Sequence, residues 1–203
     1  MKIYIARHGQ TAWNKIPRWQ GNLDVPLDET GISQVYKSAE KLSRFRISRI
    51  YSSPLKRAAA SAEILREKID AGIVYREGLR EIRLGEWEGL TSREIIEKHG
   101  RLYGEWEGNP TAQIGLGVEN VFDLQQRAYR EFYAISMAET DDFVIVAHGT
   151  WTRCLLCSLL SIPLENRMNF EVSNAGISLI SFDKNGNAPL FKVVTLNDVS
   201  HLV

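Results

Sequence analysis

Two histidines each follow a short apolar run and precede a glycine, in Arg7-His8-Gly9 and in His148-Gly149. A histidine at the end of a strand can be a nucleophile, a metal ligand or a hydrogen-bonded core residue. Arg7 favours the first role for His8, because its permanent charge and fork geometry suit phosphate oxygens. The Gly9 carbonyl can fix one imidazole nitrogen, which leaves the other with a lone pair for attack on phosphorus. We expect His148 to be protonated and to donate to the phosphoryl oxygens.

A second arginine, Arg57, falls where a strand is expected to end at residues 52–53 and Pro54 to begin a helix. A helix N-terminus carries free N–H groups and a partial positive charge, so it favours a bound phosphate. We therefore expect Arg57 to face the same anion as Arg7.

A leaving alkoxide needs a proton, and a carboxyl group among ligand oxygens can supply one near neutral pH. The segment 77–89 is rich in glutamate, and its pattern leaves the choice open among Glu77, Glu81, Glu86 and Glu88. Phosphoryl transfer requires neutralised oxygens, an in-line nucleophile and a protonated leaving group. Arginine and histidine charges can supply the first, so we expect no metal and no cofactor.

Other phosphate chemistries lack their motifs here. The sequence contains no GxxxxGK[ST] loop, and neither cysteine precedes an arginine at the spacing of a cysteine phosphatase loop. Cys154 and Cys157 could form a redox or metal CxxC, but no second Cys or His pair completes a zinc site. We expect both to be core residues one helical turn apart.

The hydrophobic periodicity predicts which elements position these residues. Strands are expected at 1–6, 47–51, 73–75, 143–147, 177–182 and 190–195, and helices at 31–45, from Pro54 onward, at 119–137 and at 151–160. This alternation predicts an α/β fold of three layers, a mostly parallel sheet flanked by helices on both faces. Ligands of such sheets bind at the carboxyl ends of the strands, so His8 and His148 are expected to converge there.

The bulk composition is that of an ordinary globular protein. The chain has 203 residues, 44% of them apolar, and its 25 basic and 25 acidic side chains leave no net charge. A nucleic-acid or anionic membrane partner would favour a basic excess, so neither is expected. We also expect no targeting segment or membrane span, a cytoplasmic location and one domain over 1–203.

Six blocks of the sequence carry a resemblance to a known family. They are ARHGQTAWN at 6–14, GNLDVPLDETG at 21–31, YSSPLKRAAASAEIL at 51–65, LREIRLGEWEG at 79–89, VAHG at 146–149 and LNDVSHL at 196–202. In these blocks and in their order, the chain resembles the histidine phosphatase superfamily, in its phosphoglycerate-mutase-like branch. The blocks are spread over nearly the whole chain.

The resemblance implies roles for individual residues. His8 matches the phosphorylated nucleophile and Glu81 the proton donor. The positions around the phosphate match Arg7, Arg57 and His148, and further substrate-binding positions match Asn14, Gln20 and Gly149. His201 lies in the last block, where either a supporting or a direct role is open. Two departures from the family pattern occur, at Val118 to Asn120, where Asn120 can still cap a helix, and at Thr150 with Trp151.

Residues 88–117 are expected to form a small helical cap, where substrate selectivity would reside. An apolar wall is possible from Trp13, Ile16, Trp19, Tyr103 and Trp106, although these residues could equally be ordinary packing. We expect a phosphomonoesterase that acts on a small phosphorylated metabolite. The alternatives are a cofactor-dependent phosphoglycerate mutase, disfavoured because the chain stops just after the last block, and a non-catalytic phosphate-binding module.

The substrate itself stays open. Broad-specificity, α-ribazole phosphate, phosphoserine and sugar-phosphate phosphatases are all compatible with the sequence. A homodimer is a further open expectation.

Overall fold

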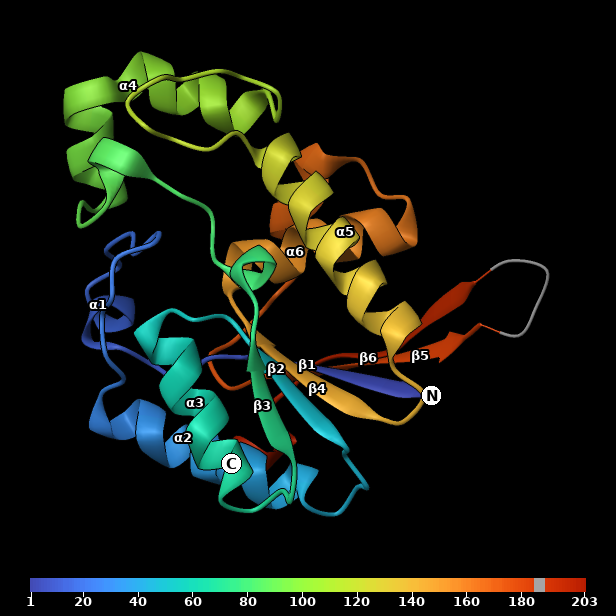
Figure 1. Ribbon diagram of the computed structural model, residues 1–203. Helices are drawn as coiled ribbons and strands as arrows, with labels where there is room; N and C mark the ends of the chain where they lie inside the picture. Colours follow the sequence, from blue (N-terminus) through green and yellow to red (C-terminus); the bar gives the residue numbers. More distant parts are fainter. Residues whose placement is uncertain (185–188) are drawn as a thin grey trace.

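The structure is a computed structural model that describes residues 1–184 and 189–203, and in these residues six strands form one sheet in the order β3-β2-β4-β1-β5-β6 (Figure 1). The strands are β1 (Lys2–Arg7), β2 (Arg49–Ser52), β3 (Gly72–Tyr75), β4 (Phe143–Ala147), β5 (Ile177–Asp183) and β6 (Leu190–Asp198). β1 to β4 run parallel, whereas β5 pairs antiparallel with β1, and β6 with β5. The predicted mostly parallel sheet is confirmed.

Helices cover both faces of this sheet, as predicted (Figure 1). They are α1 (Ala12–Lys15), α2 (Glu29–Leu42), α3 (Lys56–Arg66), α4 (Ser92–Gly108), α5 (Val121–Ala138) and α6 (Gly149–Leu160), with short 3-10 turns η1 (Glu77–Leu79), η2 (Gly85–Trp87), η3 (Leu164–Asn169) and η4 (Ser200–Leu202). Alternate side chains of β4 separate the two faces, since Val144 and Val146 pack with α2 and α3, and Ile145 packs with α5 and α6. The two cores follow from the two-residue period of a strand.

Local capping sets helix boundaries that periodicity did not predict. α2 begins at Glu29, two residues before the predicted start, because the side chain of Asp28 accepts from Gly31 N at 2.7 Å. α3 begins at Lys56, so the expectation that Pro54 opens this helix is wrong by two residues. The four-residue α1 was not predicted at all, and it is held by reciprocal bonds between Thr11 and Asn14.

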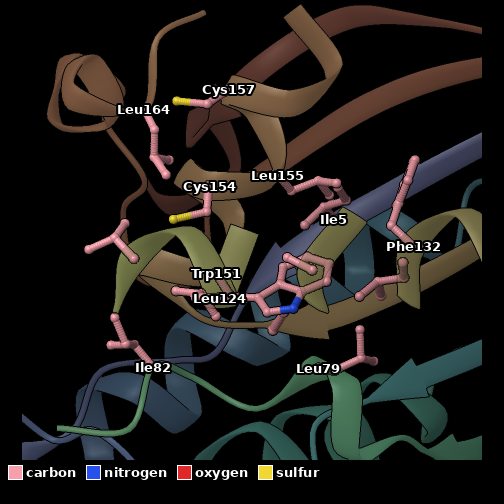
Figure 2. Packing of buried hydrophobic residues seen from close by; sticks show 14 of the residues in the cluster. Ile5, Leu79, Ile82, Leu124, Phe132, Trp151, Cys154, Leu155, Cys157 and Leu164 are labelled. Carbon is pink, nitrogen blue, oxygen red and sulfur yellow. The ribbon is translucent and has the colours of Figure 1, made fainter. Parts of the chain in front are cut away.

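Both cysteines lie on α6 in the core between that helix and its neighbours. Cys154 and Cys157 are free and buried, and Figure 2 shows them near Leu155 and Leu164. Burial raises the pKa of both thiols. The prediction that they are core residues is therefore confirmed.

Residues 88–117 contain α4, a helix of 17 residues with a break in its backbone at His99. Figure 1 shows α4 apart from the sheet, on the side of the molecule where α1 lies. Several hydrogen bonds join this segment to the loop after α1, among them Trp19 N to Leu90 O at 2.9 Å and Trp19 Nε1 to Ser92 Oγ at 2.9 Å. Within the described residues, no helix is both long enough and apolar enough to cross a membrane.

Candidate active site

Adjacent parallel strands bring the two histidines together at the carboxyl edge of the sheet. Arg7 pairs in register with Ala147, so His8 and His148 are the first residues beyond β1 and β4. Their ring centroids lie 5.2 Å apart. The convergence expected from the two strand ends is present.

His8 is held as a neutral imidazole of defined tautomer. Its Nδ1 lies 2.7 Å from Gly9 O, and because a carbonyl can only accept, Nδ1 must carry the proton. The unprotonated Nε2 then accepts from Arg57 Nε at 3.2 Å. Burial, followed by the charges of Arg57 and Arg7, lowers the pKa of His8 well below 6.5. The lone pair of Nε2 is therefore available at neutral pH.

Arg57 is fixed by the loop that precedes α2. The side chain is 1% exposed, and its two terminal nitrogens donate to Leu23 O and Gly21 O, each at 2.8 Å. These bonds leave Nε facing His8. Burial lowers the pKa of Arg57 from 12.5 to about 10, so the side chain is charged at neutral pH.

Arg7 directly precedes His8 in the chain and is the second arginine of the site. Its Nη1 donates to Val172 O at 2.7 Å, while its buried Nε has no hydrogen-bond partner among the described residues. The pKa of Arg7 is lowered to about 10, chiefly by burial; the charge of Glu81 opposes this shift, as does that of Glu171, whereas the charges of Arg153 and Arg57 add to it. A buried donor without an acceptor is costly, so Arg7 is arranged for an anion rather than for the ligand-free state.

His148 lies beside His8 and is completely buried. Within the part of the chain that the structure describes, neither ring nitrogen has a hydrogen-bond partner. Burial, and then the charge of Arg57, lowers the pKa of His148 well below 6.5, so the ring is neutral in this ligand-free state. A phosphate dianion would offset the arginine charges, which is the condition under which this ring would take a proton and donate it.

Glu81 is the carboxylate that the fold brings to this edge. Its two oxygens accept from Thr150 N at 2.9 Å and from Trp151 N at 3.0 Å, in the first turn of α6. Of the four glutamates that the pattern left open, Glu81 alone lines the cavity described below. Glu88 instead accepts from the backbone of Asn22 and Leu84.

A cavity of about 540 Å³ opens above these groups. Its floor includes Arg7, His8, Arg57 and Glu81, and its walls come from the loop after α1, from α4 and from η3. Among the described residues, no cluster of three or more His, Cys, Asp or Glu side chains is placed to hold a metal ion. The floor offers two guanidinium groups and one imidazole lone pair to an anion.

Four of the five residues expected as an apolar wall line this cavity, namely Trp13, Trp19, Tyr103 and Trp106. Ile16 does not line it and is 51% exposed. Packing also explains part of this wall, because Trp106 is buried and its ring contacts both Trp19 and Trp87 edge to face. Trp19 and Trp106 therefore line the cavity and also pack against neighbouring aromatic rings.

The residues expected to bind substrate are placed differently from one another. Asn14 lines the cavity, and its Oδ1 accepts from Thr11 N at 2.9 Å. Gln20 also lines it, with a buried Oε1 that has no partner among the described residues. Gly149 is not part of the wall, but a Cβ at this position would lie 3.6 Å from the guanidinium carbon of Arg7. A side chain here would fill the space beside that arginine.

His201 lies outside the cavity and acts through the backbone. Its Nε2 lies 3.0 Å from Ser38 Oγ and 3.1 Å from Ala175 O. Ala175, whose φ is +56°, donates its N–H to the carbonyls of Arg7 and His8. The placement is a supporting one.

The two departures from the family pattern are both accommodated. Asn120 caps α5, since its side chain accepts from Asp123 N at 2.7 Å. Val118 forms an isolated antiparallel β-bridge with Leu84. Thr150 lines the cavity, and its backbone N–H donates to Glu81. With both departures present, His8 keeps its contacts with Gly9 O and Arg57 Nε.

Sequence reasoning missed several residues that line the cavity, and three of them bear directly on its chemistry. Asn174 donates through Nδ2 to His8 O at 3.1 Å and to Gly9 O at 3.3 Å, so it helps to hold the carbonyl that fixes the His8 tautomer. Arg153 lies one helical turn after Gly149, a spacing that could have indicated it. Arg167, on η3, reaches the wall through tertiary contacts and has no such local signal.

Comparisons with known proteins show the family to which the chain belongs. Residues 3–198 match the histidine phosphatase superfamily, branch 1. Phosphoserine phosphatase 1 of Hydrogenobacter thermophilus is 29% identical over 203 residues, which cover 100% of this chain and 94% of that protein. A solved mycobacterial glucosyl-3-phosphoglycerate phosphatase is 29% identical with a TM-score of 0.85, covering 97% of this chain and 98% of that one. A probable phosphoglycerate mutase of Proteus mirabilis is 29% identical over 212 residues, covering 100% of this chain and 95% of that protein. The chain therefore belongs to branch 1 of the histidine phosphatase superfamily.

Proposed function

We propose that this protein is a metal-independent phosphomonoesterase that hydrolyses small phosphorylated metabolites through a phosphohistidine at His8. The observation that carries this proposal is the tautomer of His8, whose Nδ1 is bound to Gly9 O while Nε2 presents its lone pair beside Arg57. A nucleophile held in this way needs no base to activate it.

In the first step, His8 Nε2 attacks phosphorus and the bond to the ester oxygen breaks. Arg7 and Arg57 neutralise the phosphoryl oxygens, and Glu81 gives its proton to the departing alkoxide. In the second step, Glu81 takes a proton from water as the water oxygen attacks phosphorus, and the bond between phosphorus and His8 Nε2 breaks to release inorganic phosphate. His8 and the protonated Glu81 are thereby regenerated.

The charges of the floor make a metal ion unnecessary in this scheme. A phosphomonoester dianion carries two negative charges, and Arg7 with the buried Arg57 supplies two positive ones on the cavity floor. Fixed charges in such a site act more strongly than in water and need no reorganisation. Protonated His148 would add a further donor once the dianion is bound.

The substrates are expected to be small, with selectivity set by residues 88–117 acting as a cap on a single domain. Ser92, Tyr103, Trp106 and Glu107 of this segment line the cavity, as do Asn14 and Gln20. Gly149 contributes by having no side chain beside the guanidinium groups of Arg7 and Arg153, since a Cβ here would lie 3.3 Å from Arg153 Nη1 and 3.6 Å from Arg7 Cζ. A wall of aromatic rings above a cationic floor suits a phosphate ester with some apolar surface.

A phosphatase is favoured over a phosphoglycerate mutase. Phosphatase names are carried by relatives in both comparisons above, and these relatives are matched over nearly their whole length. The family name itself describes phosphatases. Another relative of the same percentage identity carries a mutase name, so the test below also measures isomerisation.

The proposed function is tested by a paired assay with EDTA present throughout. One arm measures phosphate release from a panel of phosphomonoesters, including phosphoserine and α-ribazole phosphate. The other measures conversion of 3-phosphoglycerate to 2-phosphoglycerate in the presence of bisphosphoglycerate. We expect phosphate release that persists in EDTA and is abolished in His8→Ala, with an acid-labile phosphoenzyme trapped in the wild type only.

Three results would contradict the proposal. They are isomerisation without phosphate release, activity that Mg²⁺ restores after EDTA, and a folded His8→Ala variant of normal rate. The cytoplasmic location and the homodimer expected from the sequence stay predictions.

A further inference from the structure

The proton donor Glu81 lies in a segment whose secondary structure does not fix its direction. Residues 80–83 belong to no helix or strand. The Glu81 carboxylate accepts from Thr150 N at 2.9 Å and from Trp151 N at 3.0 Å, two N–H groups of the first turn of α6 that have no partner within that helix. These bonds hold the end of the side chain, so the backbone of Glu81 needs a support of its own.

Arg127, on α5, supplies this support. Its Nη1 donates to Gly78 O at 3.1 Å and to Arg80 O at 2.7 Å, and its Nη2 donates to Glu81 O at 3.3 Å. One guanidinium therefore holds three backbone carbonyls, and the last of them belongs to Glu81 itself. Arginine suits this task because its five N–H donors diverge in fixed directions from one plane.

Glu119 fixes the direction of the Arg127 side chain. Its carboxylate accepts from Nη2 at 3.0 and 3.2 Å and from Nε at 3.2 Å. Glu119 is itself held, because its Oε2 accepts from Arg83 N at 3.0 Å and its backbone carbonyl accepts from Trp106 Nε1 at 3.2 Å. The side chains of Arg127 and Glu119 are 28% and 13% exposed. The guanidinium therefore cannot turn without leaving hydrogen-bonding groups unsatisfied.

Arg127 is not placed to bind the phosphoryl group. It does not line the cavity, and the carboxylate of Glu119 neutralises its charge at 3.0 Å. The bonds to the backbone also stabilise the fold, as do the buried side chains of Leu79 and Ile82 in the same segment. A purely structural role would affect all substrates alike, whereas a role in placing Glu81 would affect those whose leaving group needs a proton.

We propose that Arg127, oriented by Glu119, is a positioning residue for proton transfer. By holding the backbone of Glu81, it keeps the carboxyl group within reach of the leaving oxygen and of the attacking water. A displacement of about 1 Å can cost about 10²-fold in rate, so a contact outside the cavity can control the chemistry inside it. This inference rests on the proposed function, because it takes from there the role of Glu81 as proton donor.

The test compares two substrates that differ in their need for a proton. Benzyl phosphate releases an alkoxide that must be protonated, whereas p-nitrophenyl phosphate releases a phenolate that leaves without a proton. The measured quantity is kcat/KM, because it covers only the steps up to the departure of the alcohol. We expect Arg127→Gln to lower kcat/KM for benzyl phosphate about 30-fold more than for p-nitrophenyl phosphate. Arg130→Gln, at an exposed position of the same helix, is the matched control and should change neither value.

A double variant shows whether the effect passes through Glu81. Once Glu81→Gln has removed the proton donor, adding Arg127→Gln should change the ratio of the two kcat/KM values by no more than about twofold. An equal loss for both substrates in Arg127→Gln, or a full further loss in the double variant, would overturn the positioning role. Urea unfolding accompanies each variant. If Arg127→Gln does not fold, Glu119→Gln takes its place, and an unchanged ratio in that variant would overturn the proposal.

Hydrogen exchange separates this inference from the proposed function. The amides of Thr150 and Trp151 donate to the Glu81 carboxylate, so their exchange rates report its position whether or not the protein hydrolyses an ester. We expect Arg127→Gln to speed the exchange of both amides about tenfold relative to that of Leu156, in the interior of the same helix. Unchanged exchange would overturn the proposal. A wild type that releases no phosphate would contradict the proposed function and leave the position of Glu81 to be judged by exchange.

Discussion

Replacing Arg57 by glutamine separates its role in catalysis from its role in the fold. The buried guanidinium donates to His8 Nε2, Leu23 O and Gly21 O, and in the proposed reaction its charge faces the phosphoryl oxygens. Removing one such donor from a preorganised, desolvated site costs about 10²- to 10³-fold in kcat. We expect Arg57→Gln to lower kcat by about that factor.

The expected cost to the fold is smaller, because two effects oppose each other. Burial lowers the pKa of Arg57 from 12.5 to about 10, so removing the charge relieves about 3 kcal/mol of desolvation. Glutamine is shorter, and the carbonyls of Gly21 and Leu23 then lose a donor at about 1–3 kcal/mol each. We expect the free energy of unfolding of Arg57→Gln to lie within about 3 kcal/mol of the wild type.

Two measurements on each variant check this reasoning. Steady-state hydrolysis of p-nitrophenyl phosphate gives kcat, and urea unfolding followed by the fluorescence of the five tryptophans gives stability. Arg93→Gln, which loses an exposed pair with Glu97, should change neither. A folded Arg57→Gln variant with kcat within tenfold of the wild type would refute the role of the charge. A variant that does not fold would refute the expectation that the relieved desolvation offsets the lost hydrogen bonds.

Two further predictions concern proton transfer. Glu81→Gln should slow alkyl phosphates much more than p-nitrophenyl phosphate, because p-nitrophenolate leaves without a proton; equal slowing of both would remove Glu81 as the donor. Since His8 stays neutral in the folded state well below pH 6.5 but takes a proton in the unfolded chain, stability should be lost as pH falls below 6.5. In urea unfolding between pH 5 and 6.5, that loss should be about 1 kcal/mol per pH unit steeper in the wild type than in His8→Ala, and identical slopes would contradict the lowered pKa.

The positions of His8 and His148 could be predicted from the sequence because they depend on local pattern and one topological rule. A continuous apolar run marks β4, whose predicted and observed bounds are both 143–147. Parallel neighbours then bring their carboxyl ends together. Arg7 pairs in register with Ala147, so the two strands end side by side as expected.

The choice of carboxylate could not be made from residue types alone. Glu81 is distinguished by its bonds to Thr150 N and Trp151 N, and those partners lie 69 and 70 positions away along the chain. No periodicity encodes such a contact, so the choice depended on the resemblance to a family. Arg167 could not be predicted for a related reason, because its guanidinium lies over the ring of Trp106, which belongs to a different segment.

Short elements could not be predicted from the sequence for a third reason. α1 has four residues, which is about one helical turn and too short for an apolar stripe to repeat. Its stability comes from the Thr11 and Asn14 side chains, which bind the ends of that turn reciprocally. The same Asn14 lines the cavity, so a feature too small to predict contributes directly to the site.

The burial of both cysteines makes the natural protein a ready background for site-specific labelling. The sequence has two cysteines, and burial protects both and raises the pKa of their thiols, so maleimide reagents should not modify the folded chain. A cysteine introduced at the exposed Lys98 of α4 would then be the one reactive thiol. A fluorophore attached there, on the helix that also carries Tyr103 and Trp106 of the aromatic wall, could record in real time whether residues 88–117 move when vanadate enters the cavity.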